Sequence, residues 1–252
     1  MKTEVFFTQF FPERENLFSG TAVVMIDILR ASTTVCAALY NGAREVIPVD
    51  SPDKAVRIYN SLSREARFLG GERNGIKPAG FDAGNSPSEY SPEAIRDKTV
   101  ILSTTNGTKI FGKAGNARIK IIAGFVNISL VTKLLSGYIQ NNNEINSGIF
   151  FLCAGSDGRF SYEDTLFAGS ILNSLIELGY DLKLTDSAHA ALSLYRLNLP
   201  NLKDFIETRE HATMLKEYNF GEDIRTALTY DLFPVIPVIS GSSITKLEKL
   251  PE

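Results

Sequence analysis

Short apolar runs rich in β-branched residues alternate with helical patterns along most of the chain, and this alternation limits the fold more than any other feature. Strand-like runs occupy residues 21–26, 45–49, 67–69, 99–102, 119–122 and 148–152. Helix signals lie between them, such as the Ser51-Pro52 start of one helix and the Gly179 stop of another. The pattern predicts an α/β fold with a largely parallel or mixed sheet that is covered on both faces.

The whole chain, residues 1–252, is predicted to form one domain. Residues 181–230 are mostly helical in pattern, and 235–239, interrupted by Pro237, are predicted to form a final edge strand. If the domain has two lobes, the asparagine run that starts at Asn141 is the best break, so we expect a boundary near 141–147.

Composition excludes several classes of protein. The net charge is -3 and no basic block stands out, so nucleic acid is not an expected partner. No run reaches eighteen apolar residues, and the first fifteen residues lack a long apolar segment, so neither secretion nor a membrane partner is expected. Cys36 and Cys153 form no CxxC pair, which argues against a disulfide framework or a zinc site and favours a cytoplasmic location.

Polar clusters follow four of the strand-like runs, and ligands of open α/β sheets bind beyond the carboxyl ends of strands. In the first cluster, Asp27 could ligate a hard cation or act as a nucleophile. Arg30 could clamp a phosphate, and the hydroxyls of Ser32 and Thr33 at a helix start suit an anion. Alternatively, Asp27 pairs with Arg30 and Ser32 only caps the helix; this segment alone leaves both interpretations open.

The second cluster is a glycine-dense loop over 70–75 and 80–87, which has little predicted secondary structure of its own. Such density lets the backbone approach a ligand closely, although an ordinary tight turn is the alternative. The third cluster, residues 103–108, offers hydroxyls, an amide and a glycine before a short helix. It suits a phosphate, or it is simply a serine- and threonine-rich cap.

The fourth cluster runs from Cys153 to Arg159 and is followed by Glu163 and Asp164. The Cys-x5-Arg spacing is that of cysteine-dependent phosphatases, but Asp157 inside the loop would repel an anion, so a buried inert thiol is favoured. The two carboxylates could face a metal or merely complement a helix dipole.

Both histidines, His189 and His211, are predicted to be surface or core residues. Oxygen ligands therefore outnumber imidazole and thiolate, which favours Mg²⁺ over zinc.

Taken in order, these clusters resemble the 2-phosphosulfolactate phosphatase (ComB) family. The matching segments span most of the chain and are residues 24–34, 71–73, 80–87, 104–108, 153–155 and 163–164. The resemblance implies a three-layer α/β/α fold and a magnesium-dependent acid phosphatase. It also implies the substrate 2-phosphosulfolactate, a precursor on one route to coenzyme M.

The working hypothesis is therefore metal-assisted hydrolysis of a small phosphorylated acid. We expect Mg²⁺ to be held by carboxylates drawn from Asp27, Glu163 and Asp164, with Glu72 and Asp82 as further candidates. Arg30 and Arg73 would stabilise negative charge. Substrate contacts are expected from Ser32, Thr33, Gly71, Asn85, Thr104, Thr105, Asn106, Gly107, Thr108 and Gly155.

Three questions stay open from the sequence. The nucleophile is water, Asp27 or Cys153. A noncatalytic binding protein for a phosphorylated or sulfonated acid would use the same clusters, although so many converging charges would be costly without a metal. A homodimer is the assembly that base rates favour.

Overall fold

Strands from both ends of the chain join one mixed sheet in the order β4-β5-β3-β10-β9-β6-β2-β7-β1-β8. The computed structural model describes residues 1–10, 16–142 and 147–249. The strands are β1 (Lys2–Phe6), β2 (Ala22–Ile26), β3 (Glu45–Val49), β4 (Arg67–Gly71), β5 (Thr99–Ser103), β6 (Ile119–Ala123), β7 (Gly148–Cys153), β8 (Lys183–Leu184), β9 (Pro237–Ser240) and β10 (Ser243–Lys246). The helices are α1 (Ala31–Tyr40), α2 (Pro52–Ser61), α3 (Pro92–Ile95), α4 (Gly107–Phe111), α5 (Ile128–Asn141), α6 (Tyr162–Glu177), α7 (Asp186–Asn198), α8 (Leu202–Glu207), α9 (Glu210–Glu217) and α10 (Gly221–Ala227).

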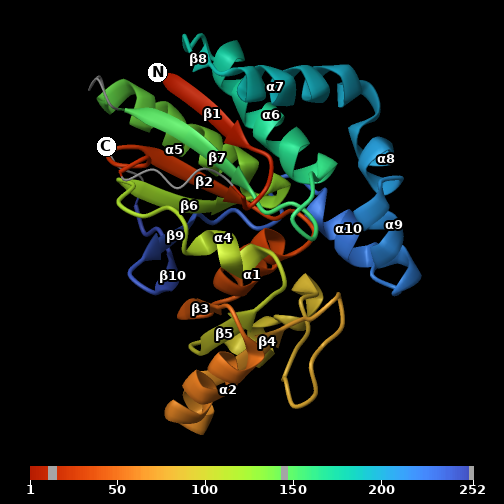
Figure 1. Ribbon diagram of the computed structural model, residues 1–252. Coiled ribbons are helices and arrows are strands. Elements are labelled where there is room, and N and C mark those ends of the chain that lie inside the picture. Colours follow the sequence, from red (N-terminus) through yellow and green to blue (C-terminus); the bar gives the residue numbers. More distant parts are fainter. Residues whose placement is uncertain (11–15, 143–146, 250–252) are drawn as a thin grey trace.

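Two blocks of parallel strands make up most of this sheet. One contains β4, β5 and β3, and the other contains β6, β2, β7, β1 and β8. The antiparallel hairpin β9–β10 joins them, and each block meets the hairpin through one residue pair, Ile244 with Val46 and Ile121 with Val238. The smaller block lies below the larger one in Figure 1, with α2 beneath it.

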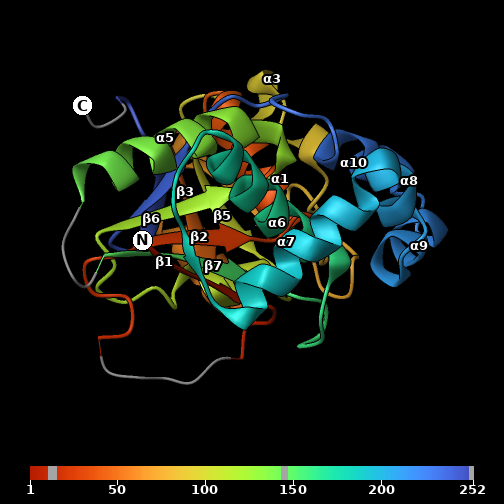
Figure 2. The same ribbon diagram turned by 90° about the horizontal axis from the view of Figure 1, so that it is seen from above.

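Strand β2 illustrates why helices cover both faces of the sheet. Its side chains are buried throughout and point alternately to the two faces, as in any strand. Val24 and Ile26 pack in one core with α5, α6 and α7, which lie over the strands in Figure 2. Val23 and Met25 pack in a second core with α1 and α4. The three-layer α/β/α fold expected from the sequence is thereby confirmed.

Most predicted elements are present, but the end of the chain differs. The strand expected at 235–239 is β9, and it lies inside the sheet between β6 and β10 instead of at an edge. Pro237 is tolerated there because it occupies the first position of the strand. The lobe boundary expected near 141–147 falls largely on residues 143–146, outside the described residues, and stays a prediction.

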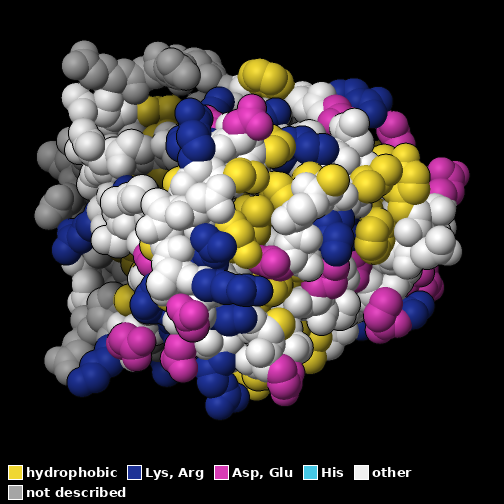
Figure 3. Space-filling model, turned by 90° about the horizontal axis from the view of Figure 1, so that it is seen from below, with side chains coloured by type: hydrophobic (Ala, Val, Ile, Leu, Met, Phe, Trp, Pro, Cys, Tyr) yellow, Lys and Arg dark blue, Asp and Glu magenta, His cyan; other side chains and the backbone are white. Residues whose placement is uncertain are grey.

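The surface is mixed in charge on the face drawn in Figure 3, where acidic and basic side chains are intermingled around hydrophobic ones. This agrees with the small net charge of -3. Among the described residues, no helix has both the length and the apolar character needed to cross a bilayer.

Candidate active site

A cavity of about 190 Å³ lies beyond the carboxyl ends of β2, β4, β5 and β7. The helices α8–α10 lie beyond the ends of β1, β2 and β7 in Figure 1, and α9 closes one side of the cavity. The lining residues are Asp27, Leu29, Arg30, Glu72, Asn74, Gly75, Asn85, Thr105, Asn106, Ser156, Asp157, His211, Met214, Leu215 and Tyr218.

Asp27 follows strand β2, which lies between β6 and β7, and it lines this cavity. Its Oδ1 accepts a hydrogen bond from the Ala31 N–H over 3.3 Å, while Oδ2 accepts none from the described residues. Gly107 backs onto the carboxylate so closely that a Cβ there would lie 2.6 Å from Oδ2. Only glycine therefore allows the start of α4 to pack against Asp27.

Burial raises the pKa of the Asp27 carboxyl from its ordinary value of 3.8 to about 6, against the opposing charge of His211. The carboxylates of Glu72 and Glu163 add to the rise. Burial of a charge surrounded by like charges is costly unless a cation compensates it. The cavity therefore favours either a proton or a metal ion at Asp27.

Asp164, in the first turn of α6, ties together the two strand ends that frame the site. Its Oδ1 accepts a hydrogen bond from the Ile28 N–H over 2.8 Å, and its Oδ2 accepts one from the Gly155 N–H over 3.1 Å. Burial, followed by the charges of Glu163 and Asp27, raises the pKa of this carboxyl well above its ordinary value. Both of its oxygens thus hold the loops after β2 and β7 in place.

Glu163 contacts His211 of α9, which sequence reasoning had placed as a surface or core residue. The Nδ1 atom of His211 lies 2.8 Å from Glu163 Oε1, and the two side chains are 15% and 3% exposed. Burial lowers the pKa of His211, but the hydrogen bond and charge of Glu163 outweigh it, so the pKa is raised. His211 is in the wall of the cavity, and Glu163 lies behind it, outside the set of lining residues.

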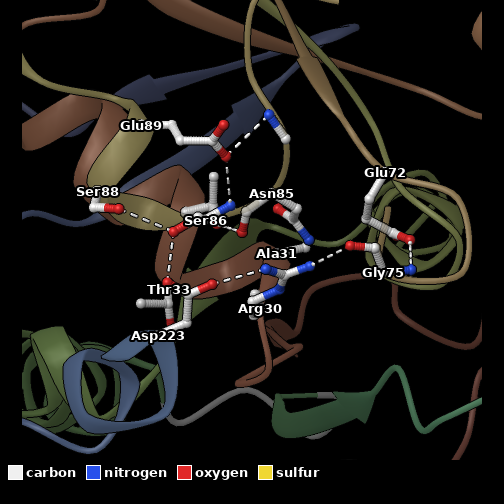
Figure 4. Close-up of polar contacts among 12 residues, drawn as sticks. Arg30, Ala31, Thr33, Glu72, Gly75, Asn85, Ser86, Ser88, Glu89 and Asp223 are labelled. Atoms are coloured by element: carbon white, nitrogen blue, oxygen red, sulfur yellow. Dashed lines mark hydrogen bonds and ion pairs between the residues drawn. The ribbon is translucent and has the colours of Figure 1, made fainter. Parts of the chain in front are cut away.

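Arg30 lies in the cavity wall but is bound on two sides by protein groups, as Figure 4 shows. Its Nη1 donates to Asp223 Oδ2 over 2.7 Å, and its Nη2 donates to the Gly75 carbonyl over 3.2 Å. Asp223 also accepts a hydrogen bond from Ser86 Oγ over 2.5 Å. The pairing of Asp27 with Arg30, which the sequence left open, is replaced by a buried pair between Arg30 and Asp223.

The charged residues predicted for the site in the glycine-dense loop occupy different environments in the structure. Glu72 lines the cavity, and its carboxylate accepts hydrogen bonds from Gly75 N–H and from the N–H and hydroxyl of Thr105. Asp82 is exposed and binds the Leu69 N–H. Arg73 donates to the Glu72 carbonyl and to Ser103 Oγ. Neither Asp82 nor Arg73 is among the cavity-lining residues.

Several predicted substrate contacts instead support the local backbone. The Ser32 hydroxyl accepts from the Asp27 N–H, and the Thr33 hydroxyl donates to the Ile28 carbonyl. Thr104 and Thr108 bond each other within the turn before α4. Gly71 has a φ of 142°, and a Cβ there would lie 2.1 Å from the Ser103 carbonyl oxygen.

Two predicted asparagines do reach the cavity. Asn85 Oδ1 and Asn106 Oδ1 are buried and have no hydrogen-bond partner among the described residues. Unpaired buried acceptors are rare in folded proteins, because each costs about 1–3 kcal/mol. Their presence in the same cavity as Asp27 is consistent with a ligand that supplies the missing partner.

Cys153 lies at the end of β7 inside the apolar core and is fully buried. Burial and the nearby Asp164 carboxylate raise the pKa of its thiol well above the ordinary value. A nucleophilic cysteine needs the opposite shift. The placement supports the inert thiol that the sequence favoured, and Arg159 is exposed and paired with Glu210.

Sequence reasoning missed the contribution of the C-terminal helices. His211 and Asp223 come from α9 and α10, in a segment without strand ends or glycine-rich loops to mark it. Asp223 is in the first turn of its helix, where acidic residues are common for electrostatic reasons alone. No local pattern distinguishes these two residues from ordinary helical ones.

Comparisons with known proteins agree with this arrangement. The sequence model of the 2-phosphosulpholactate phosphatase family matches residues 10–242. A protein of Caldanaerobacter subterraneus subsp. tengcongensis named "Probable 2-phosphosulfolactate phosphatase" is 37% identical over 222 residues, 88% of this chain and 89% of that protein. A protein of Thermotoga maritima with the same name is 40% identical over 228 residues, 90% of this chain and 92% of that protein. The chain therefore belongs to the 2-phosphosulfolactate phosphatase family.

Proposed function

We propose that this protein hydrolyses the phosphate monoester of a small acid, with 2-phosphosulfolactate as the first candidate substrate. The observation that carries the proposal is Asp27, a buried carboxylate at the end of a central strand that faces a small polar cavity next to Arg30 and His211. The names of the two relatives support the same substrate.

The donor atoms around Asp27 fit Mg²⁺. This ion prefers oxygen ligands, keeps several waters, and is commonly held by one or two carboxylates together with substrate phosphate. Asp27 would hold it, and the unpaired oxygen of Asn106 would add a neutral ligand. Among the described residues, no three His, Cys, Asp or Glu side chains are arranged as a metal site, so substrate oxygens and waters would have to complete the coordination. When bound, Mg²⁺ would neutralise charge on the phosphoryl oxygens.

The carboxylates expected beside Asp27 have other roles in this proposal. Asp164 holds two backbone N–H groups and Glu163 holds His211, so neither is retained as a ligand. Arg30, fixed by Asp223, supplies positive charge to the anionic substrate. The Asn85 amide and the Ser156 hydroxyl are neutral partners for its remaining oxygens. With Cys153 buried and Asp27 assigned to the cation, water is the nucleophile.

The test is phosphate release from 2-phosphosulfolactate, 2-phospholactate and phosphoglycerates, measured with Mg²⁺ and with excess EDTA. We expect release that requires Mg²⁺ and is fastest with the sulfonate. Faster release from a carboxylate would keep the chemistry and change the substrate. Tight binding of one compound without any release would favour the noncatalytic binding protein over the enzyme.

Both cysteines are free, which supports placing this activity in the reducing cytoplasm.

A further inference from the structure

His211 lies between two cavities and has one ring nitrogen that the described residues leave unoccupied. Its Nδ1 is bound to Glu163 Oε1 over 2.8 Å, and no described residue forms a hydrogen bond with Nε2. The ring lines the cavity that contains Asp27 and also a neighbouring cavity of about 370 Å³. Because Nδ1 is taken by the carboxylate, Nε2 is the atom that can reach a bound ligand.

Glu163 is suited to orient this ring and to keep it protonated. Its side chain is 3% exposed, so the pair with His211 is screened weakly by solvent. A buried carboxylate on Nδ1 fixes both the orientation and the charge of an imidazole, as in other histidine–carboxylate pairs. The raised pKa of His211 has the same cause. The ring therefore offers a proton at Nε2 to the cavity.

Hydrolysis of an alkyl phosphate needs such a proton. The leaving group is the alkoxide of a hydroxy acid, a strong base that departs slowly unless it is protonated as the bond breaks. Asp164 is not suited to donate a proton to it, because both of its oxygens accept backbone hydrogen bonds. Glu72 accepts three hydrogen bonds and is likewise occupied.

We propose that His211 is the general acid of the reaction and that Glu163 is its positioning residue; the inference rests on the proposed function. Water oxygen forms the new bond to phosphorus, and the ester P–O bond breaks. The electron pair of that bond goes to the ester oxygen, which takes the proton from His211 Nε2. The proton lost by the attacking water passes to phosphate or solvent, and His211 is reprotonated from solvent.

The test compares a substrate that needs a proton with one that does not. For His211→Ala and His211→Gln, kcat on 2-phosphosulfolactate is expected to fall about 10²–10⁴-fold, the usual contribution of a general acid. On 4-nitrophenyl phosphate, whose phenolate departs without protonation, we expect less than about a tenfold loss. Glu163→Gln should show the same selectivity with a smaller amplitude, and it keeps the test available if both His211 variants fail to fold.

The matched control is His189→Ala, because His189 is the other histidine of the chain and is exposed on α7. It should leave both rates unchanged. Equal losses on the two substrates in folded His211 variants would overturn the general-acid role and leave the phosphatase function intact. A wild-type protein that releases no phosphate from 2-phosphosulfolactate, from the other phosphorylated acids or from 4-nitrophenyl phosphate, with or without Mg²⁺, would instead overturn the proposed function and the inference with it.

Discussion

The guanidinium of Arg30 lies 2.7 Å from the carboxylate of Asp223, although one residue follows a strand near the start of the chain and the other begins a helix near its end. Both side chains are almost fully buried, at 2% and 5% exposure. The Arg30 guanidinium also lies over the Phe220 ring, 4.1 Å from its centre. This pair joins the C-terminal helices to the strand end that carries Asp27.

Removal of Asp223 should therefore destabilise the protein more than an ordinary surface change. Asp223→Ala leaves the Arg30 charge buried without its partner, and we expect a loss of about 3 kcal/mol in the free energy of unfolding. The matched control is Arg225→Ala on the same helix, whose pair with Glu222 is exposed and should contribute little to stability. Urea unfolding of the two variants measures both changes in stability. A loss below about 1 kcal/mol for Asp223→Ala would contradict the importance of the pair.

The close approach of α4 to Asp27 gives a second prediction. A methyl group at Gly107 would lie 2.4 Å from Ala31 Cβ and 2.6 Å from Asp27 Oδ2, so Gly107→Ala must displace one of them. We expect about 1–3 kcal/mol of destabilisation together with a marked loss of turnover. Gly112→Ala at the other end of α4 meets no atom within 4 Å and should be nearly neutral in both measurements. Equal behaviour of the two variants would show that the contact does not constrain Asp27.

The buried thiol makes a third prediction. Cys153→Ala should keep its rate of phosphate release and lose only about 1–2 kcal/mol in the free energy of unfolding. The sulfur only fills space in an apolar core, so its removal leaves a small cavity. A thiol reagent should modify neither Cys153 nor Cys36 in the folded protein and both after unfolding. The measurement is the thiol count with and without urea. Loss of turnover in a folded Cys153→Ala protein would return the cysteine to the list of nucleophiles.

The sequence predicted the fold better than it predicted the site. Strand ends and glycine-rich loops mark where ligands bind, so Asp27, Glu72 and Asn106 could be placed at the cavity in advance. Local patterns cannot reveal which oxygens the folded chain uses for its own backbone. Asp164 is a residue type that often binds metals. Only the three-dimensional arrangement reveals that both of its carboxylate oxygens accept hydrogen bonds from backbone N–H groups.

Contacts distant in sequence account for the remaining differences. His211 faces Glu163 across 48 positions, and Asp223 faces Arg30 across 193. Neither separation carries a local signature in the sequence. The position of β9 inside the sheet has a similar origin, because its partner β6 lies more than a hundred residues earlier in the chain.

The pKa of the Asp27 carboxyl is raised from 3.8 to about 6, mainly by burial. A folded-state pKa above the unfolded value means that the folded protein binds the proton more tightly. The ionised carboxylate therefore lowers the free energy of unfolding. This loss of stability is absent below about pH 3.8 and complete above about pH 6. Asp27→Asn removes this charge and keeps an oxygen for the Ala31 N–H. In EDTA we expect the variant to exceed the wild type by about 2 kcal/mol near pH 8.

This gain in stability should shrink as the pH falls to about 5, because the wild-type carboxyl then takes up its proton. Urea unfolding across this pH range measures the difference, and the same variant should lose phosphate release with Mg²⁺ present. Added Mg²⁺ should stabilise the wild type and leave Asp27→Asn unchanged, because an ion that binds only the folded state raises its stability by mass action. If the variant is less stable than the wild type at every pH, Asp27 is a structural residue; if it also turns over normally, the proposed role of Asp27 is wrong.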